Sequence, residues 1–190
     1  MTERETIEAF KSGDDLAFAL LYNRHKNGIY AFCLKMLLDR DAALDVVQDT
    51  FVRVYENRSR LLSSSSFRSW LYTIARNQCL NRLRRSRRLV SLDGQEHRIS
   101  PRSDTPASKL EKAERHRIVN RYLGSLSVSY REVIILREYH NLSYEEIAAI
   151  MRTTVSAVKS RLFKARRKLA QHLREATVRN AENKPIQDFL

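Results

Sequence analysis

Residues Leu142–Arg161, which read LSYEEIAAIMRTTVSAVKSR, decide the fold of the second half of this chain. Ser143 and Glu146 form a capping-box pattern, in which each side chain bonds the other residue's backbone at the start of a helix. The helix predicted here is short, 144–151, and a three-residue break separates it from another helix that starts at Val155. Two helices joined by so short a turn form a helix-turn-helix, a motif that many DNA-binding regulators share.

The residues on both sides of this motif also follow helical spacing. Ser129 and Glu132 repeat the capping-box pattern and predict a helix over 130–139. The last helix is expected to have one apolar face, formed by Val155, Val158, Leu162, Ala165 and Leu169. Beyond Ala176 the chain is polar, and we expect it to fray.

The first half of the chain is also predicted to be helical, because its apolar residues recur at helical rather than strand spacing. Thr2 and Glu5 form a capping box, and Gly28 is expected to mark a bend. Gly and Pro are scarce in the whole chain, at 4 and 3 residues, which favours helices over a turn-rich β fold. The helices expected here cover 2–11, 15–38, 41–57 and 66–88.

A polar segment, 91–108, separates the two halves. It contains Gly94, Pro101 and Pro106 and few apolar residues, so it is too polar to bury itself. The predicted fold is therefore all-α, with two small helical domains joined by a flexible linker. The expected parts are a first domain over 1–90, a linker over 91–108, a second domain over 109–175 and a tail over 176–190.

The charge of the chain favours a polyanionic partner. The formal net charge is +13, which is typical of proteins that bind nucleic acid or an anionic membrane surface. No apolar run reaches the roughly 18 residues of a membrane span, so we expect a cytoplasmic protein without membrane insertion. Cys33 and Cys79 lie far apart in helical patterns and are predicted to be small core residues.

The positive charge is concentrated in two helices. No acidic residue occurs between Ser59 and Leu92, a stretch that includes Arg76, Arg82, Arg84, Arg85, Arg87 and Arg88. A second basic block consists of Lys159, Arg161, Lys164, Arg166, Arg167 and Lys168. A solvated helix face normally mixes in acidic partners four residues away, so these blocks favour phosphate binding.

Each basic block has a further feature. Phe67 and Trp70 flank the first block, and either they stack on unpaired bases or they are core residues. The start of the last helix presents Ser156, Lys159, Ser160 and Arg161, and a recognition helix reads bases with its first residues.

An acidic ridge lies on the helix predicted over 41–57. Asp41, Asp45 and Asp49 recur every four residues beside Gln48. Such a ridge could be a solvated face, a Mg²⁺ site that lacks further ligands, or a docking face for a basic protein. DNA would be repelled by it, so the protein partner is favoured.

These motifs together resemble the sigma-70 family, and specifically its extracytoplasmic-function (ECF, group IV) sigma factors. The stretch 43–51 resembles the polymerase-binding signature of region 2, and 67–77 resembles the part of region 2 that melts and reads the −10 element. The stretches 142–148 and 158–166 resemble region 4, which reads the −35 element. Only these two regions occur, as in the ECF group, and the resemblance covers 15–174.

The resemblance implies a role for each matching residue. Asp45, Gln48 and Asp49 would dock on the clamp helices of the polymerase β′ subunit. The −10 strand would be bound by Phe67, Trp70, Arg76, Asn77, Asn81 and Arg84, with Phe67 and the loop 62–66 forming a pocket for a flipped-out base. The −35 duplex would be bound by Ser156, Lys159, Ser160, Arg161 and Lys164, while other faces of region 4 meet the polymerase β flap. An anti-sigma factor is implied as a further partner.

The sequence departs from the family at two positions. Leu44 stands where Glu is frequent, which weakens or shifts the acidic patch. Arg152 stands where Gly is frequent in the turn, so either Arg takes a positive φ at a cost of about 1 kcal/mol or the turn is built differently.

The predicted function is that of a sigma factor, which directs promoter-specific initiation by core RNA polymerase, reads duplex −35 DNA and captures the melted −10 strand. It has no catalytic residues and needs no cofactor or metal. A free-standing helix-turn-helix regulator explains only the second half of the chain. A serine recombinase would need a nucleophile on a catalytic scaffold, and the first half shows no strand alternation.

Overall fold

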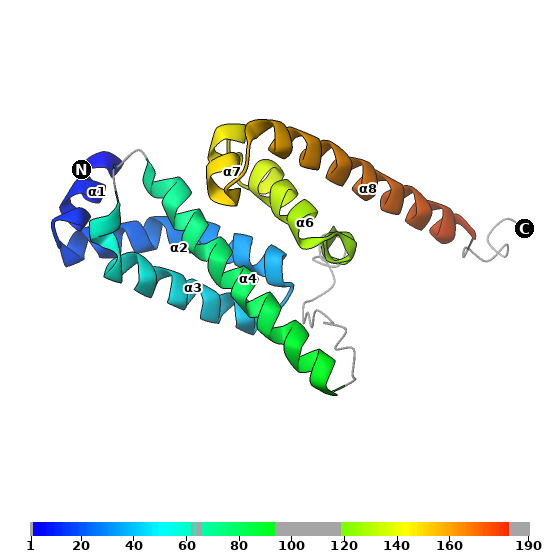
Figure 1. Cartoon of the computed structure of the whole chain (residues 1–190), viewed down its shortest axis with the longest axis horizontal. Helices are drawn as coiled ribbons and strands as arrows, with labels where there is room; N and C mark the ends of the chain where they lie inside the picture. The colour runs from blue at the N-terminus through cyan, green and yellow to red at the C-terminus, as the bar shows by residue number, and fades with distance from the viewer. Residues whose placement is uncertain (1, 62, 64–65, 94–118, 183–190) are drawn as a thin grey trace, which may run out of the picture.

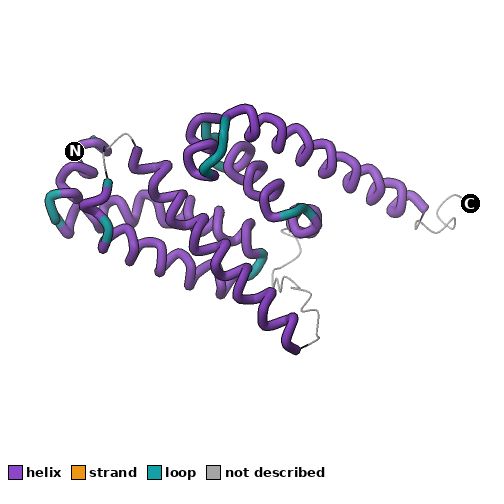
Figure 2. Tube along the Cα trace, in the orientation of Figure 1, coloured by secondary structure: helices purple, strands orange, loops and turns teal. Residues whose placement is uncertain are grey.

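The computed structural model describes residues 2–61, 63, 66–93 and 119–182, and within them all regular secondary structure is helical (Figures 1 and 2). The first half contains α1 (Glu3–Lys11), α2 (Asp15–Leu37), α3 (Arg40–Glu56), the 3-10 turn η1 (Arg58–Arg60) and α4 (Phe67–Asp93). In the second half, residues 119–125 are helical and are followed by α6 (Val128–Ile134), the π-helical turn η4 (Ile135–Tyr139), α7 (Tyr144–Met151) and α8 (Val155–Glu182). The predicted all-α class is confirmed.

Short polar side chains start the helices of the first half. The capping box predicted at Thr2 and Glu5 is present at the start of α1. The carboxylate of Asp14 accepts hydrogen bonds from two backbone amides at the start of α2, and Asp39 does the same for one amide of α3. Each of these bonds satisfies an amide that has no partner inside the helix.

The first half buries one apolar face of each long helix. α2 packs against α3 and α4, and α1 packs against α2. The buried side chains include Leu21, Ile29, Phe32, Val47, Phe51, Leu71 and Ala75. Cys33 and Cys79 are both buried, which confirms them as core residues.

The bend predicted at Gly28 is wrong, because α2 is one continuous helix through this position. Ile29 and Phe32, one and four residues further on, are fully buried. Packing of Leu21, Ile29 and Phe32, which lie before and after Gly28, therefore keeps the helix continuous through a residue of low helix propensity.

The second half confirms the helix-turn-helix. The capping box at Ser143 and Glu146 starts α7, and α8 follows after Arg152, Thr153 and Thr154. Arg152 adopts φ 51° and ψ 56°, so the turn does use a left-handed residue, and the alternative of a differently built turn is wrong.

The other capping box, predicted at Ser129 and Glu132, is wrong. The helix α6 starts two residues earlier than this pattern implies, with Ser127 as its first flanking residue and without a side-chain cap. Glu132 is instead 1% exposed and bonds to an arginine of the first half. The spacing of Ser129 and Glu132 therefore does not mark a helix start, because both residues lie inside α6.

The predicted boundaries differ from the observed helix ends. α4 runs to Asp93, past the predicted domain end at 90, and the rest of the predicted linker, 94–108, lies outside the described residues. α8 runs to Glu182, so the part of the tail over 176–182 continues that helix rather than fraying. Both helices extend because their polar continuations contain no Gly or Pro to end them.

The two halves pack directly against each other. α4 contacts α7, and α2 contacts η4 and α6. In Figure 1, α6, α7 and α8 lie above α2 and α4, and α8 projects away from the first half. Gly124 makes part of this contact possible, because a Cβ atom there would lie 3.0 Å from Cδ1 of Leu38.

Candidate nucleic-acid and polymerase interfaces

The start of α8 presents a polar and basic surface. Val158, Leu162 and Ala165 are buried against the rest of the second half, which fixes the rotation of the helix. The opposite side exposes four of the five residues predicted to read the −35 element, namely Ser156, Lys159, Ser160 and Lys164. Arg161 is half-buried and lies close enough to Glu132 to affect its pKa.

Phe163 is a further candidate on this surface that the sequence patterns do not predict. Its side chain is 68% exposed, although it is a large apolar residue. It lies three residues after Ser160 and four after Lys159, so it shares their face of α8. An apolar side chain in this place can contact the methyl group of thymine. The available signal was its position outside the apolar stripe of the helix.

The basic helix α4 exposes only some of the residues predicted to bind the −10 strand. Asn77, Asn81 and Arg84 are exposed, and Trp70 is half-buried against the core. These four residues lie on one side of α4, since their spacing of three to seven residues matches the helix repeat. They can offer amide, guanidinium and indole groups to a nucleic acid strand.

Phe67 does not contribute to this exposed surface. Its side chain is 1% exposed and contacts the rings of Phe10, His25 and Trp70. The structure thus makes Phe67 a core residue, because the first turn of α4 is covered by α1 and α2. Of the loop predicted to form a base pocket, residues 62, 64 and 65 lie outside the described residues.

Arg76 is also largely withdrawn from solvent. Its side chain is 17% exposed and forms an ion pair and hydrogen bond with Glu132 of α6, whose side chain is 2% exposed. Burial raises the pKa of Glu132, and the bond from Arg76 opposes this effect. The sequence patterns predict that Arg76 binds DNA and that Glu132 caps a helix, whereas the structure pairs these two residues with each other.

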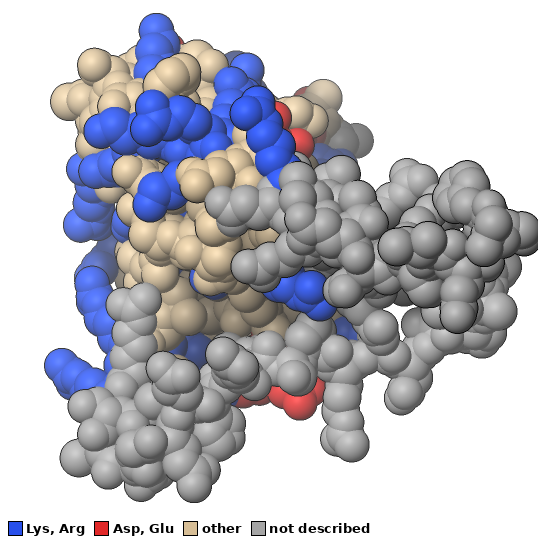
Figure 3. Space-filling model, turned by 90° about the vertical axis from the view of Figure 1, so that its right-hand side faces the viewer, with Lys and Arg blue, Asp and Glu red and all other residues tan. Residues whose placement is uncertain are grey.

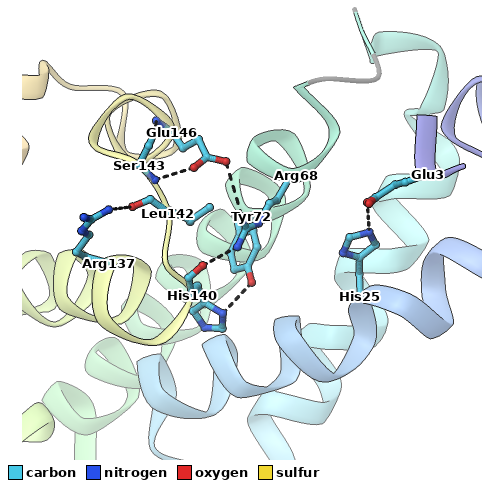
Figure 4. Close-up of polar contacts among 9 residues, drawn as sticks. All are labelled: Glu3, His25, Arg68, Tyr72, Arg137, His140, Leu142, Ser143 and Glu146. Atoms are coloured by element: carbon cyan, nitrogen blue, oxygen red, sulfur yellow. Dashed lines mark hydrogen bonds and ion pairs between the residues drawn. The ribbon is translucent and has the colours of Figure 1, made fainter.

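Two more residues of α4 contact the second half at His140 (Figure 4). Arg68 donates a hydrogen bond of 2.6 Å to the backbone carbonyl of His140, and the Tyr72 hydroxyl lies 2.9 Å from its Nδ1. Burial, together with the nearby cations of Arg68 and Lys35, lowers the pKa of His140 to about 4. Burial also raises the pKa of Tyr72 to about 12. Both rings are therefore neutral at pH 7.

The acidic ridge is exposed along α3. Asp45, Gln48 and Asp49 all face solvent, while Val46, Val47 and Thr50 are buried between α3 and its neighbours. Asp45 lies 3.9 Å from a guanidinium nitrogen of Arg82 on α4. Among the described residues no group of three or more His, Cys, Asp or Glu side chains is arranged to hold a metal ion.

Two apolar side chains extend this acidic surface. Leu44 and Val52 are 51% and 55% exposed and lie beside the carboxylates on the same helix. The surface therefore combines negative charge with exposed apolar area. Such a combination suits a protein helix that carries both basic and apolar residues.

Positive charge dominates the visible part of the face shown in Figure 3. Lys and Arg side chains cover much of its upper and left-hand parts, and Asp and Glu appear only in small areas between them and the grey residues. No helix within the described ranges is long and apolar enough to cross a membrane.

Two family matches cover most of the described chain. Residues 21–89 match Sigma-70 region 2, and residues 116–169 match Sigma-70 region 4. The chain is 33% identical to an ECF RNA polymerase sigma-E factor of Haemophilus influenzae, over 87% of this chain and 92% of that protein. It is 29% identical to the ECF RNA polymerase sigma factor SigW of Bacillus subtilis, over 92% of this chain and 98% of that protein.

Solved structures show the same likeness. One is CnrH in complex with the cytosolic domain of CnrY, with a TM-score of 0.70 at 28% identity, covering 91% of this chain and 97% of that one. Another is the sigma factor RpoE in complex with the anti-sigma factor NepR from Bartonella quintana. Its TM-score is 0.71 at 29% identity, and the match covers 83% of this chain and 96% of that one.

An all-helical chain with a basic helix-turn-helix and an exposed acidic ridge, matched along both halves to sigma-70 regions, defines a transcription initiation factor. The chain belongs to the ECF group of the sigma-70 family of RNA polymerase sigma factors. It is a non-enzymatic subunit that binds core RNA polymerase and promoter DNA and directs transcription initiation.

Proposed function

We propose that three separate surfaces of this sigma factor divide the work of initiation. The ridge of Asp45, Gln48 and Asp49 on α3 docks on a basic and apolar surface of core polymerase, which the family resemblance identifies as the β′ clamp helices. Its support is the exposure of all three side chains beside Leu44 and Val52. The protein acts in the cytoplasm, where polymerase and promoter DNA are present.

The start of α8 reads the −35 element as duplex. Ser156, Lys159, Ser160 and Lys164 project from the first three turns of a recognition helix, where side chains reach base edges in a major groove. Arg161 supports this surface from a half-buried position, and Phe163 adds an apolar contact. Other faces of this half meet the polymerase β flap, as the family resemblance implies.

The exposed side of α4 captures the −10 strand after it melts. Asn77, Asn81 and Arg84 supply hydrogen bonds and positive charge, and Trp70 supplies a ring beside them. Because bases that leave the duplex need stacking partners and cations, such a surface favours the single strand and pulls the equilibrium toward melting. Phe67 supports the Trp70 ring from the core, at 6.2 Å between ring centroids.

An anti-sigma factor is a further partner in this proposal. The support is the likeness to CnrH and to RpoE. CnrH was solved with the cytosolic domain of CnrY, and RpoE was solved with the anti-sigma factor NepR. The likeness covers 91% of this chain for CnrH and 83% for RpoE, so it includes both halves.

The observation that carries the proposal is the exposure of Asn77, Asn81 and Arg84 on one side of α4. Permanganate reactivity of thymines at the start site tests it, with polymerase holoenzyme that contains the full chain. Asn77→Ala with Asn81→Ala should reduce strand opening, whereas Asn27→Ala, an exposed amide on α2, should not. Equal opening by both variants would contradict the assignment of α4.

A further inference from the structure

The exposed face of α8 continues well past the turns that are proposed to read the −35 element. Ser156, Ser160 and Phe163 lie on this face. Arg167 and Arg174 follow them, so that successive members are four, three, four and seven residues apart, which is the repeat of one helix face. All five side chains are exposed. One row of side chains therefore runs along α8 from its first turn to Arg174.

Contacts on the opposite side of α8 fix the direction in which this row points. Leu162 and Ala165 are buried, and Leu169 packs against the core. The ring of His172 stacks on the ring of Tyr122, with 6.0 Å between centroids and 15° between planes. The second half thus holds α8 as far as His172, and the row faces away from these contacts. In Figure 1 this part of α8 projects away from the first half.

The two arginines of the row are not used within the second half. Neither Arg167 nor Arg174 has a carboxylate partner among the described residues, whereas Arg166 pairs with Glu138 of η4. No acidic residue occurs over 147–174. A solvated helix face normally places acidic residues beside its basic ones. This face is therefore suited to an anionic partner.

The spacing of the two arginines favours an extended anion. An open hollow lies between them, lined by Arg167, Ala170, Gln171 and Arg174. Seven residues of helix rise about 10.5 Å, which is the axial length of about three successive phosphates of one DNA strand. Arginine also binds phosphate oxygens through two parallel hydrogen bonds. The pair therefore suits several phosphates of a nucleic acid strand better than one compact anion.

The length of α8 places these arginines beyond the base-reading turns. Ser156 and Lys164 are about 12 Å apart along the helix axis, which matches the width of about 12 Å of a major groove. Arg167 and Arg174 lie about 4.5 and 15 Å further along the axis than Lys164. A straight helix that fills the groove with its first turns must cross a bordering strand with later ones. The end of the homeodomain recognition helix contacts the DNA backbone in this way.

We propose that Arg167 and Arg174 form a phosphate clamp on the duplex that borders the −35 element. The clamp binds DNA of any sequence, so it adds affinity and fixes the register of α8 without reading bases. Two observations favour DNA over an acidic protein, namely the continuity of the row with the reading turns and the spacing of the two guanidinium groups. The inference rests on the proposed reading of the −35 element by α8.

The salt dependence of promoter binding tests the clamp. Holoenzyme assembled from core polymerase and the full chain is titrated with a labelled promoter duplex at a series of salt concentrations. Arg167→Ala and Arg174→Ala should each reduce the slope of log affinity against log salt by about 1. Lys168→Ala is the matched control, because it removes a charge from the same turn of α8 but from a side chain that lies over the Tyr130 ring. Its slope should equal that of the wild type.

Methylphosphonate groups, each of which removes the charge of one phosphate, locate the contact. Neutral phosphates at the border of the −35 element should weaken binding by the wild-type holoenzyme. The same phosphates should have no further effect on the double variant Arg167→Ala with Arg174→Ala. Both proteins should show the same ratio of affinities for a promoter with an intact −35 element and for one in which that element is replaced, because the clamp does not read bases.

An unchanged salt slope in both arginine variants would overturn the clamp. Loss of holoenzyme assembly in these variants, with normal DNA binding by the holoenzyme that does assemble, would also overturn it and assign the row to an acidic surface of polymerase. A wild-type holoenzyme that does not distinguish the intact from the replaced −35 element would instead overturn the proposed reading role of α8.

Discussion

Arg76 on α4 and Glu132 on α6 form an ion pair between the two halves of the chain, with side chains 17% and 2% exposed. A residue that the family resemblance assigns to DNA thus has a carboxylate partner in the absence of DNA. The pair joins the first half to the second, because α4 and α6 belong to different halves.

Glu132→Ala should lower the free energy of unfolding, because it removes the hydrogen-bond acceptor that Arg76 meets and leaves a gap in the core. We expect about 2–3 kcal/mol, less than the roughly 3–5 kcal/mol for breaking a fully buried pair, because Arg76 still reaches water. Glu138→Ala breaks an exposed pair and should change the value by no more than about 0.5 kcal/mol. Urea unfolding of both variants measures the difference, and equal stabilities would show that burial does not strengthen the Arg76 pair.

The contact at His140 should weaken as pH falls. The pKa of His140 is lowered from 6.5 to about 4, so its neutral form stabilises the native chain above pH 6.5, and this stability is lost as pH falls toward 4. His140→Asn should remove that part of the pH dependence. His25, whose pKa is also lowered by burial, remains in both proteins and cancels in the comparison.

The pH dependence of stability that Glu132 contributes has the opposite sign to that of His140. The pKa of Glu132 is raised, so its contribution is present below its ordinary pKa and is lost as pH rises through the raised value. Urea unfolding at pH 7 and pH 5 separates the two residues. A wild-type chain and a His140→Asn variant with the same pH dependence would contradict the role of His140.

Asp49→Arg should abolish binding to core polymerase while both halves stay folded. The side chain is exposed on α3, so the substitution reverses charge on the docking surface without disturbing the core. Glu8→Arg makes the same charge change on α1 and serves as the control. Co-elution with core polymerase measures binding, and retained binding by the folded Asp49 variant would count against the docking assignment.

Arg161→Ala should weaken initiation at promoters that depend on the −35 element, by about tenfold for one lost DNA contact. Arg121→Ala removes an exposed arginine outside the helix-turn-helix and should have little effect. The comparison uses one promoter with an intact −35 element and one in which that element is replaced. Equal activity of the Arg161 variant and wild type at the intact promoter would remove Arg161 from the reading set.

Arg152→Gly should stabilise the second half. Arg152 takes a φ of 51°, a left-handed conformation that Gly adopts without the Cβ clash, so we expect a gain of roughly 0.5–1 kcal/mol. Ala149→Gly, at an exposed position inside α7, should instead cost about 1 kcal/mol. Thermal unfolding of the two variants should show shifts in opposite directions, and destabilisation by both would mean that Arg152 gains more from its side chain than it loses in backbone strain.

Local patterns predicted much of the fold. The helix-turn-helix followed from Ser143, Glu146 and the short break before Val155, because caps and apolar periodicity act within a few residues. The same local patterns predicted a bend at Gly28 and a helix cap at Ser129, and both predictions are wrong. At both positions contacts from distant helices determine the structure, and no local pattern reports them.

The candidate site was predicted less completely than the fold. Exposure of Asn77, Asn81 and the start of α8 agrees with the predicted roles, but Phe67 is a core residue and Arg76 is paired with Glu132. Arg68, Tyr72 and His140 were not predicted to meet at all. Their partners lie about 70 positions away in the chain, as the Tyr72–His140 separation of 68 residues shows, and one sequence carries no signal for such pairing.

Run-off transcription from a panel of genomic promoter fragments tests the central claim most directly. It uses purified bacterial core polymerase with and without the full chain. We expect initiation at defined start sites only when the chain is present. No stimulation of transcription, together with tight duplex binding by the chain alone, would contradict it and favour a free-standing helix-turn-helix regulator.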